Sequence, residues 1–173
     1  MAVREILLLG DPILRTKCRK VADFSAPKVK DTLDDLRDTL EHFRSSHGFG
    51  RGIAAPQIGS TQRIIVINRA APIAMMNPVI TQRSYETMTL WDDCFSFPDI
   101  MVKLVRWMKI HVRYRNESGE KQELEAAGDL SELLQHEIDH LNGVLALDRA
   151  IDSKHIILRS EWKKLTQQHG QPF

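Results

Sequence analysis

The clearest structural signal in the sequence is the stretch Leu130-Ser131-Glu132-Leu133-Leu134-Gln135-His136-Glu137-Ile138-Asp139-His140-Leu141-Asn142. Its apolar residues return at helical spacing, which predicts a helix over residues 130–142. Asp129 and Glu132 fit a capping box at the start of this helix, with Asp in place of the usual Ser or Thr. Gly143 follows the segment and is a typical helix stop. We therefore expect an amphipathic helix with a defined start and end.

A helical wheel places charged groups on the apolar face of this segment. At about 100° per residue, His136 and His140 fall on one side of the helix, because they are four residues apart. Glu137 lies inside the apolar arc, whereas Gln135 and Asp139 fall outside it. An unpaired carboxylate on a buried face is costly, and two histidines at this spacing can bind one metal ion. The pattern predicts a metal site beside Glu137; the alternative is a helix with two hydrogen-bonded core histidines and an accidental glutamate.

Two further helices are expected on either side of this one. Apolar residues recur at steps of four and three over residues 27–46, as one face of a helix requires. Ser25 is placed to cap the start of that helix and Gly48 to end it. A third helix is expected to begin near Asp152 or Ser153.

Strands occupy the sequence between the first two helices. Residues 108–115 alternate apolar and polar side chains, which is typical of a half-buried strand. Residues 116–119 predict a hairpin turn that returns along residues 121–126. The other predicted strands are residues 63–67, residues 79–80 after a break at Asn77-Pro78, and residues 85–91.

The order of these elements is helix, several strands, helix and helix. It favours an α+β fold with antiparallel sheets over a doubly wound fold. The chain has 173 residues, and about 100–200 residues is usual for one domain. We see no internal repeat and no linker in the sequence, so we expect a single domain over residues 1–173.

Composition narrows the class of function. Hydrophobic residues make up 42% of the chain and charged residues 27%, which is close to the globular average and excludes disordered and fibrous classes. The 24 basic and 23 acidic residues leave a net charge of +1, which argues against nucleic acid or a membrane surface as the partner. The apolar run Ile6-Leu7-Leu8-Leu9 is too short for a membrane span or a signal peptide. We therefore expect a cytoplasmic protein.

Two histidines supply only part of a metal site, because a catalytic zinc-like site takes three protein ligands and a water. In a reducing compartment, the widely separated Cys18 and Cys94 are expected to be thiols or metal ligands rather than a disulfide. Cys94 is the preferred third ligand, and Cys18 is expected to be a small buried apolar residue. His155 is a weaker candidate, because it lies in a different predicted helix.

Three motifs resemble the signature of the peptide deformylases, and they occur in the right order. They are Gly50-Arg51-Gly52-Ile53-Ala54-Ala55-Pro56-Gln57, Cys94-Phe95-Ser96 and His136-Glu137-Ile138-Asp139-His140. The similarity also includes Gly10-Asp11-Pro12-Ile13-Leu14-Arg15, Asn77-Pro78 and Leu141-Asn142-Gly143-Val144-Leu145, so it covers about residues 4–150. Three ordered motifs are specific, whereas any one of them alone is a weak signal.

The resemblance implies a fold, a cofactor and a reaction. The fold is α+β, with antiparallel sheets packed around a central helix that carries the His-Glu-x-x-His motif. One divalent metal ion is bound by Cys94, His136 and His140; ferrous iron is common in the family, and zinc, nickel or cobalt can take the site. The reaction removes the N-formyl group from the initiator methionine of newly made polypeptides and releases formate. The partner is an N-formylated nascent polypeptide; contact with the ribosome and the oligomeric state stay open.

The resemblance also assigns roles to individual residues. Glu137 maps to the general base, which takes a proton from water and delivers it to the leaving amine. The side-chain amide of Gln57 and the backbone N–H of Phe95 map to the donors that stabilise the oxyanion. Gly50 and Gly52 map to a segment that the substrate backbone approaches closely. Taken alone, Gln57 would be an exposed loop amide.

Two positions depart from the family pattern, and both map to the substrate-binding segments. Arg51 stands where the family has an aliphatic residue that lines the methionine pocket, and Asp93 stands where it has glycine. A carboxylate beside a thiolate ligand should oppose thiolate formation. We expect Arg51 either to pair with Asp92 or Asp93 across the substrate entrance or to point, like them, into solvent.

Arg106 is similarly expected to pair with Asp139. This ion pair would neutralise Asp139, the acidic residue of the His-Glu-x-x-His motif that the helical wheel places off the apolar face.

These observations leave three functions open. The leading one is a metal-dependent deformylase. The second is a deformylase-like protein that binds a metal or a peptide N-terminus without turnover, although the intact Glu137 and Gln57 argue against it. The third is a hydrolase for another N-acyl group or an unusual N-terminal residue, which the departures at Arg51 and Asp93 suggest.

Overall fold

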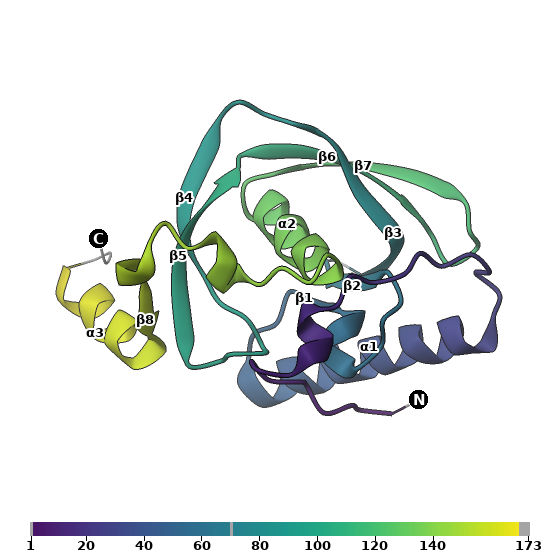
Figure 1. The fold of residues 1–173 in the computed structure, drawn as a ribbon, viewed down its shortest axis with the longest axis horizontal. Helices are drawn as coiled ribbons and strands as arrows, with labels where there is room; N and C mark the ends of the chain where they lie inside the picture. The colour runs from purple at the N-terminus through teal and green to yellow at the C-terminus, as the bar shows by residue number, and fades with distance from the viewer. Residues whose placement is uncertain (1, 70, 170–173) are drawn as a thin grey trace.

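The computed structural model describes residues 2–69 and 71–169 (Figure 1). The described residues form the helices α1 (Pro27–His47), α2 (Asp129–Leu141) and α3 (Arg159–His169). The strands are β1 (Gly52–Ala54), β2 (Ile64–Asn68), β3 (Pro72–Arg83), β4 (Thr87–Asp92), β5 (Ile100–Trp107), β6 (Lys109–Arg115), β7 (Lys121–Ala127) and β8 (Ile156–Leu158).

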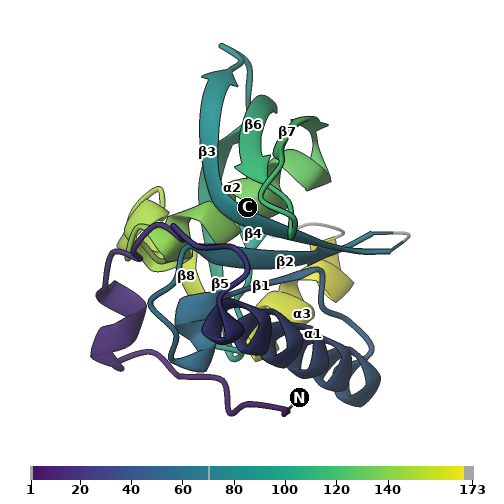
Figure 2. The same cartoon turned by 90° about the vertical axis from the view of Figure 1, so that its right-hand side faces the viewer.

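The strands form two antiparallel sheets that surround α2. One sheet has the order β1-β2-β3-β6-β7 and the other has the order β4-β5-β8, and the strands of each sheet pair in antiparallel fashion. Figure 1 shows α2 between the strands of the two sheets, and Figure 2 shows α1 beside β1 and β2, at the end away from β6 and β7. The predicted α+β fold with antiparallel sheets is therefore confirmed.

Strand β2 shows how the larger sheet separates two layers of core. Side chains alternate between the faces of a strand, and both faces of β2 are buried. Ile64 and Val66 pack with α1 residues such as Leu36, whereas Ile65 and Ile67 pack with α2 residues such as Leu134. A continuous apolar run is what a strand between two helices requires. The predicted buried strand at residues 63–67 is confirmed.

Helix α2 is buried on all sides, although its sequence is amphipathic. The expectation that Gln135 and Asp139 lie outside the buried face is wrong, since their exposed fractions are 4% and 6%. Both side chains find polar partners. Gln135 Oε1 accepts a hydrogen bond from the backbone of Trp107, and Asp139 accepts from two arginines. A helical wheel cannot show that a second sheet covers the polar side of the helix.

The predicted helix starts are wrong in their details. Ala26 is the N-cap of α1 and Pro27 fills its first turn, so Ser25 does not cap the helix and donates to Asp23 instead. Gly128 is the N-cap of α2, so Asp129 is a helical residue and no capping box forms. Glycine suits this position because its φ is +56°, in the left-handed region that other residues avoid.

The observed ends of helices and strands agree better with the predicted ends where a glycine or a hairpin turn determines them. The residue after α1 is Gly48, which ends the helix in the left-handed conformation as predicted. The predicted hairpin turn is confirmed, since the N–H of Gly119 donates to the carbonyl of Asn116 between β6 and β7. At Asn77 the chain does not break: φ is +54°, and the side chain bonds both the N–H and the carbonyl of Val21. Strand β3 therefore continues through a bulge.

Three strands were not predicted, and each is short or hidden by an ambiguous pattern. Strand β1 lies inside the glycine-rich stretch, β5 follows the Cys94 motif, and β8 occupies the place of the predicted third helix. A short 3-10 helix, Ser153–His155, does begin at the predicted place with Asp152 as its N-cap, but the longer helix α3 begins only at Arg159. In the described part of the chain, the helices are too short or too polar to cross a membrane.

We expect Gly143→Ala to destabilise the protein more than Gly59→Ala. Both glycines have a left-handed φ, +72° and +82°, so both substitutions carry backbone strain of about 1–2 kcal/mol. A Cβ at Gly143 would lie 2.4 Å from the carbonyl oxygen of Arg15, whereas a Cβ at Gly59 meets nothing within 4 Å. Urea unfolding should show Gly143→Ala costing at least about 2 kcal/mol more. Equal costs would mean that the backbone contact at Gly143 relaxes freely.

Candidate metal centre and active-site cleft

Cys94, His136 and His140 converge beside α2. The loop after β4 carries Cys94, and α2 carries both histidines one turn apart. His140 Nε2 lies 3.2 Å from Cys94 Sγ and 3.2 Å from His136 Nε2. All three residues are buried, and one potential ligand atom from each lies within 4.8 Å of the others. The structure therefore brings together the three residues that the sequence suggests as metal ligands.

This donor set fits a divalent metal ion. Such ions hold nitrogen at about 2.0 Å and sulfur at about 2.3 Å, so the ligand atoms around a tetrahedral ion lie about 3.3–3.6 Å apart. The observed separations of 3.2 Å are close to that range. Two imidazoles and one thiol suit iron, zinc, nickel or cobalt. Three protein ligands also leave a coordination position open, as catalytic sites require.

A buried network of ion pairs orients the first histidine. The Asp92 carboxylate lies 3.0 Å from His136 Nδ1, which directs Nε2 toward Cys94. Asp92 also accepts from Arg106 at 3.2 Å. These contacts outweigh burial, which by itself raises the pKa of Asp92, and hold that pKa below its ordinary value. Arg106 also forms an ion pair with Asp139, as predicted, and Asp139 forms a second ion pair with Arg149. Carboxylates that hold the second nitrogen of a ligating histidine fix its ring and tautomer.

Glu137 reaches the same cleft from the next position on α2. Its carboxylate is buried, and its Oε2 has no hydrogen-bond partner within the described residues. Burial, opposed by the charge of His136, raises the pKa of Glu137 to about 7. A carboxylate with a free oxygen and a pKa near neutrality can both accept and donate a proton.

Gly52 in β1 makes room for this carboxylate. A Cβ at Gly52 would lie 2.7 Å from Glu137 Oε1. The absence of a side chain at this position therefore leaves the space that the Glu137 carboxylate occupies, in addition to the role at the substrate backbone that the sequence suggests. Gly50 is also crowded: a Cβ there would lie 2.9 Å from Arg44 Cγ and 3.2 Å from the ring of Phe95.

We expect Gly52→Ala to lower the turnover number at least about tenfold, because it displaces the Glu137 carboxylate. Metal content should stay unchanged, since no proposed ligand is touched. The control is the same substitution in a Glu137→Gln background, where no carboxylate remains to be displaced. Elemental analysis and initial rates measure both effects. A second tenfold loss in that background would place the effect of Gly52 elsewhere.

Gln57 is fixed with its amide nitrogen toward Cys94. Its Oε1 accepts from the backbone N–H of Ala54 at 2.9 Å, so its Nε2 faces Cys94 Sγ at 3.6 Å and Ser96 Oγ at 3.3 Å. The side chain is buried and is therefore not an exposed loop amide. Phe95 stacks on Phe43 at 3.8 Å between ring centroids, which holds its backbone next to Cys94.

A cleft of about 320 Å³ connects these residues. Its wall includes Gly50, Gly52, Gln57, Cys94, Phe95, His136 and Glu137, together with Arg51 and Asp93. The structure therefore gathers the candidate catalytic and substrate-binding residues around one opening. Phe49, Glu132, Leu133 and Arg159 also line the cleft, and the sequence did not single them out as functional.

Arg51 pairs with neither Asp92 nor Asp93, so both expected arrangements are wrong. Its guanidinium donates to the Glu132 carboxylate at 2.5 Å and to the backbone carbonyl of Asp129 at 3.3 Å. Glu132 is buried, whereas Arg51 is half exposed. Burial and the nearby Asp92 raise the pKa of Glu132, and Arg51 opposes that shift. The helical position of Glu132, one turn before His136, was the signal that could have revealed this pair.

The Asp93 side chain pairs with Arg159, the first residue of α3. Arg159 donates to the Asp93 carboxylate at 2.7 Å and to the backbone carbonyl of Pro98 at 2.5 Å. This pairing compensates the carboxylate charge that we expected to oppose thiolate formation. From the sequence alone, Arg159 belonged to a basic tail that a solvated helix face explains equally well.

Comparison with known proteins identifies the family of the chain. The family model described as polypeptide deformylase matches residues 3–155. The peptide deformylase of Thermotoga maritima is 38% identical over 157 residues, which are 90% of this chain and 92% of that protein. Its crystal structure has a TM-score of 0.81 at 37% identity and covers 88% of this chain and 100% of the other.

A second solved structure extends the match through nearly the whole chain. The peptide deformylase of Legionella pneumophila has a TM-score of 0.81 at 31% identity, and the match covers 98% of this chain and 96% of that one. Both the sequence and the fold are thus shared over more than two thirds of the length. The chain belongs to the polypeptide deformylase family of hydrolases.

Proposed function

We propose that Cys94, His136, His140, Glu137, Gln57 and Phe95 carry the deformylase reaction in this chain. The enzyme removes the N-formyl group from newly made polypeptides and releases formate. The observation that supports these assignments most strongly is the buried Glu137 carboxylate, which keeps one oxygen free beside a cluster of one thiol and two imidazoles. An unpaired buried carboxylate is costly, and a role in proton transfer accounts for it.

The residues of the cleft divide the chemistry between them. A divalent ion held by Cys94, His136 and His140 would polarise the reacting groups and make hydroxide available near neutral pH. Glu137 takes the proton of the attacking water at its free oxygen and delivers it to the leaving amine nitrogen. The Gln57 amide and the Phe95 backbone N–H stabilise the negative charge that develops on the formyl oxygen. The C–N bond then breaks, which gives formate and a free amine.

We propose ferrous iron as the native ion, with zinc, nickel and cobalt as alternatives. The mixed imidazole and thiolate set accepts all four, and the family resemblance favours iron. Anaerobic purification followed by elemental analysis identifies the metal. Sensitivity of the activity to air would support iron, and an air-stable activity with stoichiometric zinc would contradict it.

The proposed substrate is a nascent polypeptide with formyl-methionine at its start. We propose that the enzyme acts on it in the cytoplasm, where translation takes place. We propose that residues 1–173 act as one domain and need no nucleic-acid contact. The Arg51–Glu132 pair is the observation that favours an altered preference at the first side chain. It sets a charged group in the wall of the cleft where the family resemblance predicts an aliphatic one. The aliphatic stem of Arg51 can still cover an apolar side chain while its head stays in water.

The test is formate release from formylated peptides that differ in their first residue. The enzyme should release formate from formyl-methionine peptides and also accept peptides with a polar first side chain. No formate from any peptide by the metal-loaded enzyme would favour a binding protein without turnover. Release of a different acyl group in the absence of formate would favour the third function.

We expect Arg51→Ile to destabilise the fold and Arg51→Ile/Glu132→Leu to restore it. The single change leaves the buried Glu132 carboxylate without a counter-charge, which should cost about 1–3 kcal/mol. The double change removes both charges and also converts the wall to an apolar one, so kcat/KM for formyl-methionine peptides should rise. Urea unfolding and initial rates on the same preparations measure both. Additive losses of stability would show that the pair contributes nothing.

A further inference from the structure

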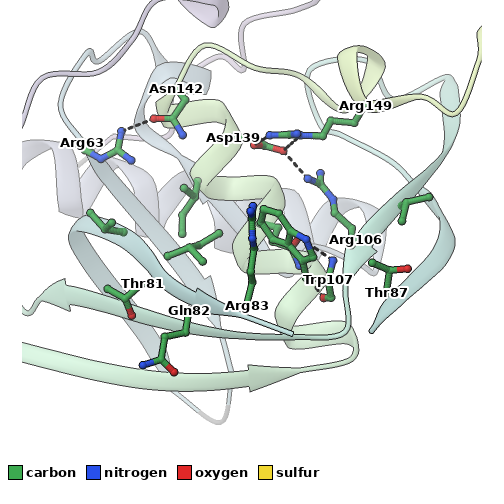
Figure 3. A pocket seen from close by; sticks show the side chains of 15 residues that line it. Arg63, Thr81, Gln82, Arg83, Thr87, Arg106, Trp107, Asp139, Asn142 and Arg149 are labelled. Atoms are coloured by element: carbon green, nitrogen blue, oxygen red, sulfur yellow. Dashed lines mark hydrogen bonds and ion pairs between the residues drawn. The ribbon is translucent and has the colours of Figure 1, made fainter. Parts of the chain in front are cut away.

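A second cavity, of about 680 Å³, lies beside α2 (Figure 3) and is lined by none of the proposed metal ligands. The cleft uses Glu132, Leu133, His136 and Glu137 of α2. The second cavity uses Gln135, Ile138, Asp139 and Asn142 instead. At about 100° per residue the mean directions of these two sets differ by about 140°. The rest of its wall comes from strand β3, the first residue of β4, strand β5, and the two residues Arg63 and Arg149.

The cavity wall is strongly basic. It contains four arginines and one carboxylate, that of Asp139. Asp139 lies between Arg106 and Arg149 and accepts from both, as Figure 3 shows. Outside the cavity, Asp92 compensates one further charge through Arg106. Four guanidinium groups against two carboxylates leave two positive charges uncompensated.

Arg63 and Arg83 carry these two charges. Arg63 is buried and donates to the backbone carbonyls of Leu141 and Pro78 and to the side chain of Asn142. Within the described residues it has no carboxylate partner, and burial lowers its pKa. Arg83 likewise has none there; its guanidinium lies 4.5 Å from the ring centroid of Trp107. Arg83 is exposed, whereas Arg63 is buried, and a buried cation without a counter-charge is costly unless a ligand supplies one.

Arg106 provides an independent sign of a missing ligand. Its side chain is 2% exposed, and Arg106 is one of the residues that line the cavity. The Nε–H of Arg106 is buried and has no acceptor among the described residues. Buried donors in native proteins are nearly always satisfied, so this donor calls for an acceptor that the described chain does not supply.

We propose that this cavity binds a small organic dianion with an apolar or aromatic body. Guanidinium groups bind the oxygens of phosphate and carboxylate groups in pairs of hydrogen bonds, and two uncompensated positive charges match a ligand with two negative charges. Ile80, Ile138, Val105 and the Trp107 ring give the body of such a ligand an apolar surface. The volume exceeds that of an inorganic ion several times, which favours an organic ligand.

The cavity and the metal centre share one chain of contacts. Arg106 connects Asp139 at the cavity to Asp92, and Asp92 holds His136 in the cleft. A ligand that accepts a hydrogen bond from Arg106 therefore contacts the partner of Asp92, the carboxylate that orients His136. Binding in the cavity needs no change in the cleft, and it stands apart from the deformylase assignment.

Equilibrium dialysis of the metal-loaded full chain tests the proposal. The probes are adenosine 5′-monophosphate, phenylsuccinate and adenosine, which compare a phosphate dianion, a dicarboxylate and a neutral body. We expect one of the two dianions to bind saturably at one site per chain and adenosine to bind at least about tenfold more weakly. The dianion that binds more tightly identifies whether phosphate or carboxylate is the natural group.

Matched variants locate the site. Arg83→Ala and Arg149→Ala should each weaken dianion binding about tenfold, since each removes a charged donor. Arg113→Ala, an exposed arginine on β6 outside the cavity, should leave it unchanged, and formate release should stay intact in Arg83→Ala. Three results would overturn the proposal: neither dianion binds, binding is equal in Arg83→Ala and Arg149→Ala and wild type, or a formyl-methionine peptide displaces the probe.

Discussion

Replacing Glu137 by glutamine is expected to lower the turnover number for formyl-methionine peptides at least about 10²-fold while the metal content stays at the wild-type level. Glutamine keeps the size of the side chain but cannot take a proton from water. None of the three proposed metal ligands is altered. Elemental analysis on the same preparation separates loss of metal from loss of the base. Wild-type rates in metal-loaded Glu137→Gln would exclude Glu137 as the general base.

The same substitution should not destabilise the protein at pH 8. Burial raises the pKa of Glu137 to about 7, above the value of an unfolded glutamate. Ionising it in the folded state therefore costs free energy, and this cost is present above pH 7 and absent at low pH. Glutamine removes it. Urea unfolding at pH 8 should give an equal or higher free energy of unfolding, and a large loss of stability would show that the carboxylate holds the fold together.

Replacing Cys94 by alanine is expected to remove most of the bound metal, and activity with it. Two histidines remain, and loss of one of three protein ligands weakens a site of this kind strongly. Cys18→Ala is the matched control, because Cys18 is also a buried free cysteine. It lies in the core with residues such as Ile65 and Leu141, where burial raises the pKa of its thiol to about 11. Equal metal content in Cys94→Ala and wild type would remove Cys94 from the ligand set.

Much of the fold could be predicted from local pattern. The period of the apolar residues gave α1 and α2, and alternation gave the β6–β7 hairpin, because burial on one face imposes these periods on the sequence. Strand β1 could not be predicted, since its role is to pass close to Glu137 and glycine leaves no pattern there. Strand β5 was hidden for a different reason, because Lys103 and the buried Arg106 interrupt its apolar run.

The candidate site was predictable where one element or a family motif supplied the residues. The spacing of His136 and His140 is a property of one helix, and Cys94 came from the motif upstream. The partners of charged groups were not predictable, because they depend on which elements the fold brings together. Arg51 could have met Asp92, Asp93 or solvent, and it meets Glu132, which the sequence shows only as a helix residue. Asp93 likewise meets Arg159 from a helix whose start was misplaced.

The most direct test of the account is the time course of formate and free amine from a formyl-methionine peptide, measured side by side for metal-loaded wild type and metal-loaded Glu137→Gln. Amide hydrolysis requires one amine for each formate, so the account predicts equal amounts of both products from the wild type. It predicts rates lower by at least about 10²-fold from the variant at equal metal content. Free amine without formate, or equal rates from the two proteins, would contradict it.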